Sequence, residues 1–241
     1  MTICPSTNRR ASHAGSSSSR NSAYYLKGCL KAAPTYNAMV RIRLANDGDA
    51  DAIAAIYRPV VEGTAISFET IAPDGAEMSR RLAETLSDYP WLVCERDGQV
   101  AGYAYATQHR VRAAYQWSVD TSVYIAAAHK RSGVGRGLYQ SLFAILAAQG
   151  FFNAFAGIAL PNPASVALHE ATGFEKLGVY KNVGFKLGEW RDVGWWQLAL
   201  QQTQVPTSAP LALAVVQGQS AWDLLLARGE GVVRARAMEH A

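Results

Sequence analysis

The stretch from His129 to Leu142, HKRSGVGRGLYQSL, combines glycines, positive charge and the beginning of a helical pattern. The first backbone N–H groups of a helix have no intrahelical partner, and the helix dipole adds positive potential at the same end. Glycines at this point leave room for a phosphate group to approach those donors. We therefore expect an anion site, lined by Lys130, Arg131, Ser132, Gly133, Val134, Gly135 and Arg136.

Two other phosphate-binding motifs do not account for this stretch. A GxGxxG dinucleotide fingerprint would require glycine at the position of Leu138. A P-loop would require GxxxxGK followed by Ser or Thr, and the chain has no such run. Taken alone, the stretch also fits an ordinary glycine-rich turn that precedes a helix.

The neighbouring sequence narrows the choice. The loop KRSGVG (130–135) follows an expected strand, and four further segments accompany it in order: DYPWLVCERDGQVAGYAYA (88–106), AYQWSVDTSVYI (114–125), LPNPASVALHEATGF (160–174) and VGFKLGEWRDVGWWQL (183–198). The loop resembles the Q/R-x-x-G-x-G/A motif of the GNAT acetyltransferase superfamily, with Lys130 where Gln or Arg is usual. The other segments resemble the phosphinothricin N-acetyltransferase branch, and the resemblance covers about residues 40–200.

This resemblance implies acetyl-CoA as co-substrate, with its pyrophosphate on the loop, and no metal. Acetyl transfer to an amine needs a base for the acceptor ammonium, stabilisation of charge on the thioester oxygen and a proton donor for the thiolate. Asp120 is the expected base, because it lies in a strand of aromatic and β-branched residues and the branch has Glu there. Asp is one methylene shorter, so we expect proton transfer through a water. The alternative is a carboxylate on a solvated strand face.

His169 is the expected acid or thiol-orienting group, since the branch has His at this position and an imidazole titrates near neutral pH. A helix-end His stabilised by the dipole is the alternative. Cys94 is interpreted as a core residue. Leu187 replaces a His that is common in the branch.

Two arginines and a phenylalanine are expected at the acceptor. Arg110 and Arg112 alternate in an extended loop, where they can bind a carboxylate or phosphinate, unless the loop is simply solvated. Phe68 matches a family loop that closes over the acceptor, whereas Glu69 is assigned either to a cap or to solvent. The resemblance further implies that Asn162 contacts the pantetheine arm, although a helix N-cap explains it equally. Main-chain groups of Val123 and Ile125 would bind the same arm as a strand binds a sheet edge.

The elements that position these residues form a mixed α+β pattern. A strand begins after Met39, followed by a helix capped by Asp49 or Asp51 and a second helix over 76–86. Three antiparallel strands follow, the first two joined by an Asp97-Gly98 hairpin, then a helix to Gln149 and a strand over 152–160. A short helix over 162–172 and further strands to Leu200 complete the order. We expect a mostly antiparallel, twisted sheet flanked by helices and splayed at its central strands.

Composition sets the limits of the domain. Residues 1–46 carry seven basic residues and no acidic one, whereas the rest carries 16 basic and 19 acidic residues, which argues against a nucleic-acid-binding face. The Ser/Arg-rich segment 1–38 is interpreted as a disordered head, either a targeting segment or a start placed too early. Residues 39–201 form the expected catalytic domain, and 202–241 a Pro/Ser/Thr linker with a short helical tail. Cysteine usage favours a reducing compartment, and no apolar run spans a membrane.

The sequence therefore predicts a cytoplasmic, homodimeric N-acetyltransferase for small amino-acid-like amines, without a nucleic-acid or membrane partner; import into an organelle remains an alternative. A role in detoxification and herbicide resistance follows from the resemblance. The alternatives are acetylation of a different amine and a non-catalytic acyl-CoA sensor, which would not need Asp120 and His169. A polycationic acceptor is disfavoured by Arg110 and Arg112.

Overall fold

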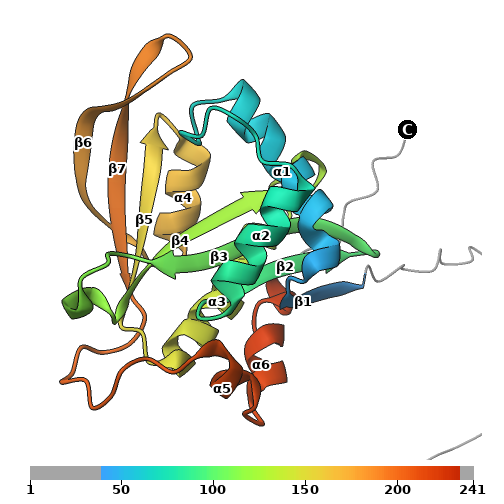
Figure 1. Cartoon of the computed structure of the whole chain (residues 1–241), viewed down its shortest axis with the longest axis vertical. Coiled ribbons are helices and arrows are strands. Elements are labelled where there is room, and N and C mark those ends of the chain that lie inside the picture. Colours follow the sequence, from blue (N-terminus) through green and yellow to red (C-terminus); the bar gives the residue numbers. More distant parts are fainter. Residues whose placement is uncertain (1–38, 234–241) are drawn as a thin grey trace, which may run out of the picture. The chain divides into compact units, whose positions relative to one another are not determined.

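The computed structural model describes residues 39–233, and Figure 1 shows how their helices and strands are arranged. The head 1–38, with Cys4 and Cys29, lies outside the described residues. Within those residues one sheet has the order β1-β2-β3-β4-β5-β7-β6. Its strands are β1 (Val40–Leu44), β2 (Trp91–Arg96), β3 (Gln99–Gln108), β4 (Ser118–Ile125), β5 (Asn153–Leu160), β6 (Glu175–Lys186) and β7 (Glu189–Ala199). The helices are α1 (Ala50–Gly63), α2 (Gly75–Leu86), α3 (Val134–Gln149), α4 (Pro163–Ala171), α5 (Leu213–Gln217) and α6 (Trp222–Ala227).

The two faces of the sheet carry different helices, as strand β2 shows. Leu92 and Cys94 belong to the apolar cluster that contains the buried residues of α3. Trp91 and Val93 alternate with them and belong to the cluster of α1 and α2. Helix α3 therefore covers one face, and α1 with α2 covers the other, which confirms the predicted mixed α+β architecture (Figure 1).

The sheet opens in its middle. Strands β4 and β5 are parallel and pair only from Ser118–Asn153 to Asp120–Phe155. Beyond this point β4 stays paired with β3 as far as Ile125, and β5 stays paired with β7 as far as Leu160. The facing edges of β4 and β5 thus separate immediately after Asp120, and this is the expected splay.

Most turns follow the predicted chemistry, but one cap differs. Asp97 (φ 51°) and Gly98 (φ 77°) form the expected hairpin, and Gly150 (φ 96°) ends α3 in the left-handed conformation. Neither Asp49 nor Asp51 caps α1 in the predicted way. A short 3-10 turn precedes α1, so the cap falls earlier, at Asn46, whose side chain accepts from the Gly48 N–H at 2.9 Å.

The region after Gln201 is more ordered than a linker with one short helix. Residues 202–212 contain neither helix nor strand, but α5 and α6 follow and pack along α3 (Figure 1). Leu213 and Val216 are buried, and the Gln149 side-chain amide donates to the Leu211 carbonyl at 3.0 Å. A short helix was expected here, but the surface on which it packs could not be predicted, because the Pro/Ser/Thr segment separates the tail from the domain. No helix in the described part of the chain has the length and hydropathy needed to cross a membrane.

Candidate active site

The loop before α3 has the geometry of an anion site. Arg131 (φ 60°) and Gly133 (φ 87°) are both left-handed, and α3 begins at Val134. Such a turn at a helix N-terminus directs successive N–H groups to one side, where an anion can bind them. The cationic side chains of Lys130, Arg131 and Arg136 are exposed beside it.

Other loop residues have roles within the protein itself. The Ser132 hydroxyl donates to the His129 carbonyl at 2.6 Å, which stabilises the turn. Val134 is buried in the core, so only its main chain is available to a ligand. A Cβ on Gly135 would lie 2.9 Å from the Leu168 side chain of α4, and a Cβ on Gly133 would overlap the Val232 carbonyl oxygen. Close packing therefore requires these glycines in addition to any phosphate contact.

A small cavity lies in the gap between β4 and β5. It has a volume of about 60 Å³, and its lining includes Val123, Ile158 and Asn162. The edge of β4 that faces the gap has no β5 partner beyond Asp120, so β5 does not pair with the main chain at Val123 and Ile125. Asn162 lines the cavity and also caps α4, because its Oδ1 accepts from the Ser165 N–H at 3.2 Å.

His169 lines the same cavity from α4 and is held at both ring nitrogens. Its Nδ1 lies 2.8 Å from the Ser165 carbonyl oxygen, and its Nε2 lies 2.8 Å from the Tyr139 hydroxyl. A carbonyl only accepts, so Nδ1 carries the proton and Nε2 accepts from Tyr139. Burial lowers the pKa of His169, which favours this neutral form. Tyr139 was not predicted from the sequence to be a site residue.

Asp120 faces the opposite side of β4. Val119 packs in the α3 cluster and Tyr124 against the α1 cluster, so alternation places Asp120 on the α1 side. Its Oδ1 lies 2.7 Å from Nδ1 of His109, and the His109 ring stacks on Phe155 at 4.3 Å between centroids. Burial raises the pKa of Asp120, and the hydrogen bond from His109 opposes that rise.

His109 was not predicted from the sequence to be a site residue. Its neighbour Arg110 drew attention by charge, whereas the contact with Asp120 depends on how the end of β3 lies against β4. Thr107 pairs with Asp120, and His109 follows two residues later on the same side of the chain. Only the strand register reveals this pair.

Arg110 and Arg112 lie in different surroundings. The guanidinium of Arg110 lies 3.9 Å from Asp120 Oδ2 and 5.7 Å from the centre of the Trp195 ring. It lines a cavity of about 260 Å³ together with His109, Phe155 and Trp195. Arg112 is exposed at the start of a 3-10 turn and is not part of this lining. The structure therefore brings Arg110, but not Arg112, close to Asp120.

The segment between α1 and α2 contacts the site differently from the expectation. Ile66 lines the cavity at the β4–β5 gap, whereas the Phe68 ring lies against the backbone of Gly184 in β6. Glu69 is neither a cap nor a solvated residue. Its carboxylate binds Arg81 of α2 at 2.8 and 3.0 Å and accepts from the Tyr57 hydroxyl at 2.9 Å.

Remaining candidates are structural in this fold. Cys94 is fully buried, and burial raises the pKa of its thiol to about 12, so it is no nucleophile. Leu187 (φ 55°) lies at the exposed tip of the β6–β7 hairpin. Trp196 is in the core, whereas Trp190 is 62% exposed.

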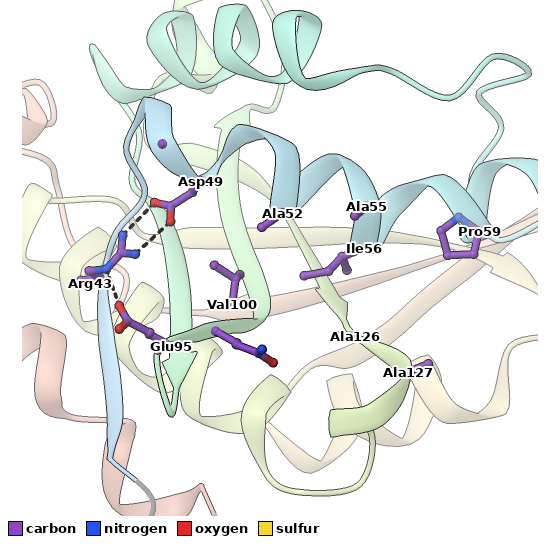
Figure 2. A pocket seen from close by; sticks show the side chains of 13 residues that line it. Arg43, Asp49, Ala52, Ala55, Ile56, Pro59, Glu95, Val100, Ala126 and Ala127 are labelled. Atoms are coloured by element: carbon purple, nitrogen blue, oxygen red, sulfur yellow. Dashed lines mark hydrogen bonds and ion pairs between the residues drawn. The ribbon is translucent and has the colours of Figure 1, made fainter.

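A larger cavity of about 710 Å³ lies elsewhere, between α1 and the β2–β3 hairpin (Figure 2). Its charged groups satisfy one another: the Arg43 guanidinium binds Asp49 at 2.7 Å and Glu95 at 3.0 Å. The rest of the lining shown in Figure 2 is mainly short or apolar, with Ala52, Ile56 and Pro59 along α1. We assign no chemistry to it.

Comparison with known proteins agrees with this geometry. The family model described as an acetyltransferase (GNAT) domain matches residues 42–195, which include Asp120, the β4–β5 gap and the loop over residues 130–136, called the anion loop below. The chain belongs to the GNAT acetyltransferase family. The match ends before α5, so the packed tail lies outside it.

Relatives of this GNAT acetyltransferase act on amino-acid-like compounds. The chain is 41% identical over 158 residues to phosphinothricin N-acetyltransferase of Streptomyces viridochromogenes, covering 66% of this chain and 86% of the relative. It is 35% identical to the L-methionine sulfoximine/L-methionine sulfone acetyltransferase of Salmonella typhimurium, covering 68% and 97%. A phosphinothricin acetyltransferase of Sinorhizobium meliloti, solved in complex with acetyl-CoA, has a TM-score of 0.67 at 34% identity and covers 71% and 95%. The predicted family and branch are therefore confirmed.

Proposed function

We propose that this GNAT acetyltransferase transfers the acetyl group of acetyl-CoA to the α-amino group of a small amino-acid-like acceptor. Phosphinothricin, methionine sulfone and methionine sulfoximine are the model acceptors, because relatives that match most of their length carry these names. The observation that carries the proposal is the β4–β5 gap, which begins beside Asp120 and is lined on the α3 side by Tyr139 and His169.

The residues present fit acetyl-CoA. The left-handed turn at Arg131 and Gly133 leads into the N-terminus of α3, where N–H groups can bind a pyrophosphate. The unpaired edge of β4 offers main-chain groups to the amides of a pantetheine arm, and Asn162 lies at the far side of the gap. When bound, acetyl-CoA supplies an acyl group activated as a thioester.

Asp120 is the proposed base. Its carboxylate accepts a proton from the acceptor ammonium, directly or through a water, and thereby frees the amine lone pair. The Nδ1–H of His109 donates to Oδ1, which orients the carboxylate and leaves Oδ2 for the acceptor. Partial burial keeps bulk water from competing for this carboxylate.

Arg110 is the proposed anchor for the acceptor's carboxylate. Its guanidinium lies beside Asp120 and over Trp195, at the edge of the 260 Å³ cavity. A guanidinium binds a carboxylate through two parallel N–H donors, which places the α-amino group at a fixed distance. Arg112 would then serve at most as a distant charge.

Tyr139 and His169 act at the thiol side of the gap. Neutral His169 accepts from the Tyr139 hydroxyl and so fixes the orientation of that hydroxyl at the cavity lining. The pair would therefore orient the thiol rather than protonate it, because the Tyr139 hydroxyl proton is held by His169 Nε2 and the His169 Nδ1 proton by the Ser165 carbonyl.

A panel of amino-acid acceptors tests the proposal. Free-thiol release from acetyl-CoA is expected with phosphinothricin and methionine sulfone, and much less with the corresponding decarboxylated amines. The control is Arg110→Gln, which should raise the KM of the acceptor about tenfold or more while the KM of acetyl-CoA stays within about twofold, since an ion pair broken on one side costs at least about 2 kcal/mol. Acetyl-CoA binding without thiol release from any acceptor would instead indicate an acyl-CoA sensor.

The proposal includes a homodimer in the cytoplasm. The β6–β7 hairpin is rich in exposed apolar side chains, which supports association of two copies. Detoxification of amino-acid analogues, and resistance to a herbicide of that type, would follow from the activity.

A further inference from the structure

The chain continues past its family match into a segment that packs on the cofactor-binding helix. The match ends at residue 195, whereas α5, α6 and a final 3-10 turn (Glu230–Val232) extend to the end of the described residues. Val233 is buried in the same apolar cluster as α3, and Leu225 and Leu226 pack against that cluster. We call residues 226–233 the C-terminal brace.

The brace contacts one face of α3 through backbone atoms. Gly133, Gly137 and Ser141 are four residues apart and therefore share a face. A Cβ on Gly137 would lie 2.6 Å from the Gly229 carbonyl oxygen, and a Cβ on Gly229 would overlap the Gly137 carbonyl. The brace thus approaches α3 as closely as two backbones can.

Two hydrogen-bonded contacts fix this position. The Ser141 hydroxyl donates to the Leu226 carbonyl at 2.6 Å and accepts from the Gly229 N–H at 3.1 Å. The carboxylate of Glu230 accepts from the Ile42 N–H at 2.8 Å. Since β1 is an edge strand, this second contact occupies a main-chain donor that the sheet leaves unpaired.

The brace reaches the anion loop itself. The Val232 carbonyl lies against Gly133, the left-handed residue that begins α3. On the opposite side of the same turn, Gly135 lies against Leu168 of α4. The first turn of α3 is therefore held between α4, which belongs to the family fold, and the brace, which does not.

We propose that the C-terminal brace is a positioning element for acetyl-CoA. It holds the Gly133 turn in its left-handed conformation, so that the N–H donors of the loop are ordered before the pyrophosphate arrives. A loop that must become ordered on binding loses affinity by the free energy of that ordering. This inference rests on the proposed function, because it assumes that the loop binds pyrophosphate.

Two glycines in the brace provide the test and its matched control, both in the full chain. Gly229→Ala introduces a methyl group that overlaps Gly137, whereas Gly231→Ala introduces the same group where nothing lies within 4 Å. We expect Gly229→Ala to weaken acetyl-CoA binding about tenfold by calorimetry and to speed amide hydrogen exchange over residues 131–137. The KM of the acceptor should change less than about twofold, and Gly231→Ala should match the wild type throughout.

A second pair covers the case in which Gly229→Ala does not fold. Glu230→Ala removes the acceptor for the Ile42 N–H, and Glu230→Gln retains one, so only Glu230→Ala should weaken acetyl-CoA binding and speed exchange in the loop. Faster exchange with unchanged acetyl-CoA affinity would overturn the proposal, and so would unchanged exchange in a folded Gly229→Ala protein.

S-acetylpantetheine separates this inference from the proposed function. It lacks the pyrophosphate, so the brace variants should use it as well as the wild type does. If the brace variants lose as much activity with S-acetylpantetheine as with acetyl-CoA, the brace does not act through the pyrophosphate loop. Failure of the proposed function would appear differently, as absence of thiol release in the wild-type protein.

Discussion

At the scale of single residues, the proposed base is defined by its neighbours. An Asp carboxylate in a strand between apolar residues is a poor anion, and burial raises the pKa of Asp120 accordingly. The His109 hydrogen bond and the positive charge of Arg110 both favour the ionised form. The balance leaves a carboxylate that is more basic than a solvated one.

His109→Phe should move the acid limb of activity to higher pH. The ring would keep its stacking on Phe155, but the hydrogen bond to Asp120 would be lost. Because that bond stabilises the carboxylate, its loss raises the pKa of Asp120 further, and kcat/KM falls at a higher pH than in the wild type. Profiles of kcat/KM against pH measure the shift.

Asp120→Asn is the companion variant. It should lower kcat about 100-fold or more, the usual range for loss of a general base, and leave acetyl-CoA affinity near normal by calorimetry. Full activity of Asp120→Asn would remove Asp120 from the mechanism. If the acid limb of the kcat/KM profile does not shift in His109→Phe, then His109 does not influence the pKa of Asp120.

At the scale of elements, the acceptor side depends on how the loop after α1 is tied to the β6–β7 hairpin. Lys186, at the end of β6, is buried, and its ammonium donates to the Val61 carbonyl at 2.6 Å and to the Ser67 carbonyl at 2.7 Å. Phe68 follows immediately and lies against Gly184. One side chain of β6 therefore holds both the end of α1 and the loop that carries Phe68.

Lys186→Met should destabilise this connection. The thioether fills similar space but leaves two buried carbonyls without their donor, which costs about 1–3 kcal/mol in the free energy of unfolding. Lys181→Met is the control, because Lys181 is exposed in its pair with Asp192, and a surface pair of this kind contributes at most about 1 kcal/mol. Urea denaturation gives both values, and equal losses in the two variants would contradict the assignment.

The weaker hold on this loop in Lys186→Met should also change the kinetics of the acceptor. We expect Lys186→Met to raise the KM of the acceptor several-fold, because the loop carrying Ile66 and Phe68 is held less firmly. The KM of acetyl-CoA should stay within about twofold, since the anion loop lies at α3. If only the KM of acetyl-CoA rose, the loop would contribute to cofactor binding and not to acceptor binding.

At the scale of the whole molecule, the fold was readable from the sequence because its signals are local. Alternation in the strands, the Asp97-Gly98 turn and the Gly150 cap each require only a few neighbouring residues. The tail was not readable in this way. Its contacts join Gly229 to Gly137 and Glu230 to Ile42, which are far apart in the chain.

The candidate site residues show the same contrast between local signals and long-range contacts. Asp120 and His169 were predicted from residue type and motif, whereas their contacts with His109 and Tyr139 depend on strand register and helix packing. Gly133 illustrates the limit most clearly. Its sequence context indicates a phosphate, yet the structure gives it a second reason to be glycine, the Val232 carbonyl.

The apolar surface of the β6–β7 hairpin leads to the last prediction, a homodimer. Phe185 is 61% exposed and Trp190 is 62% exposed, and their rings contact each other at 5.5 Å between centroids. Val183 and Leu187 are exposed on the same hairpin. Large apolar patches of this kind are rare on monomers and mark protein interfaces.

Sedimentation equilibrium of the full chain should therefore give a dimer, and Phe185→Ser combined with Trp190→Ser should give a monomer. Removing two aromatic anchors takes away the side chains that contribute most to a typical interface. Leu224→Ser is the control, because Leu224 is 76% exposed on α6, away from the hairpin, and its loss should leave the dimer intact. A dimer that survives the double substitution would move the interface elsewhere, and a monomeric wild type would end the dimer proposal.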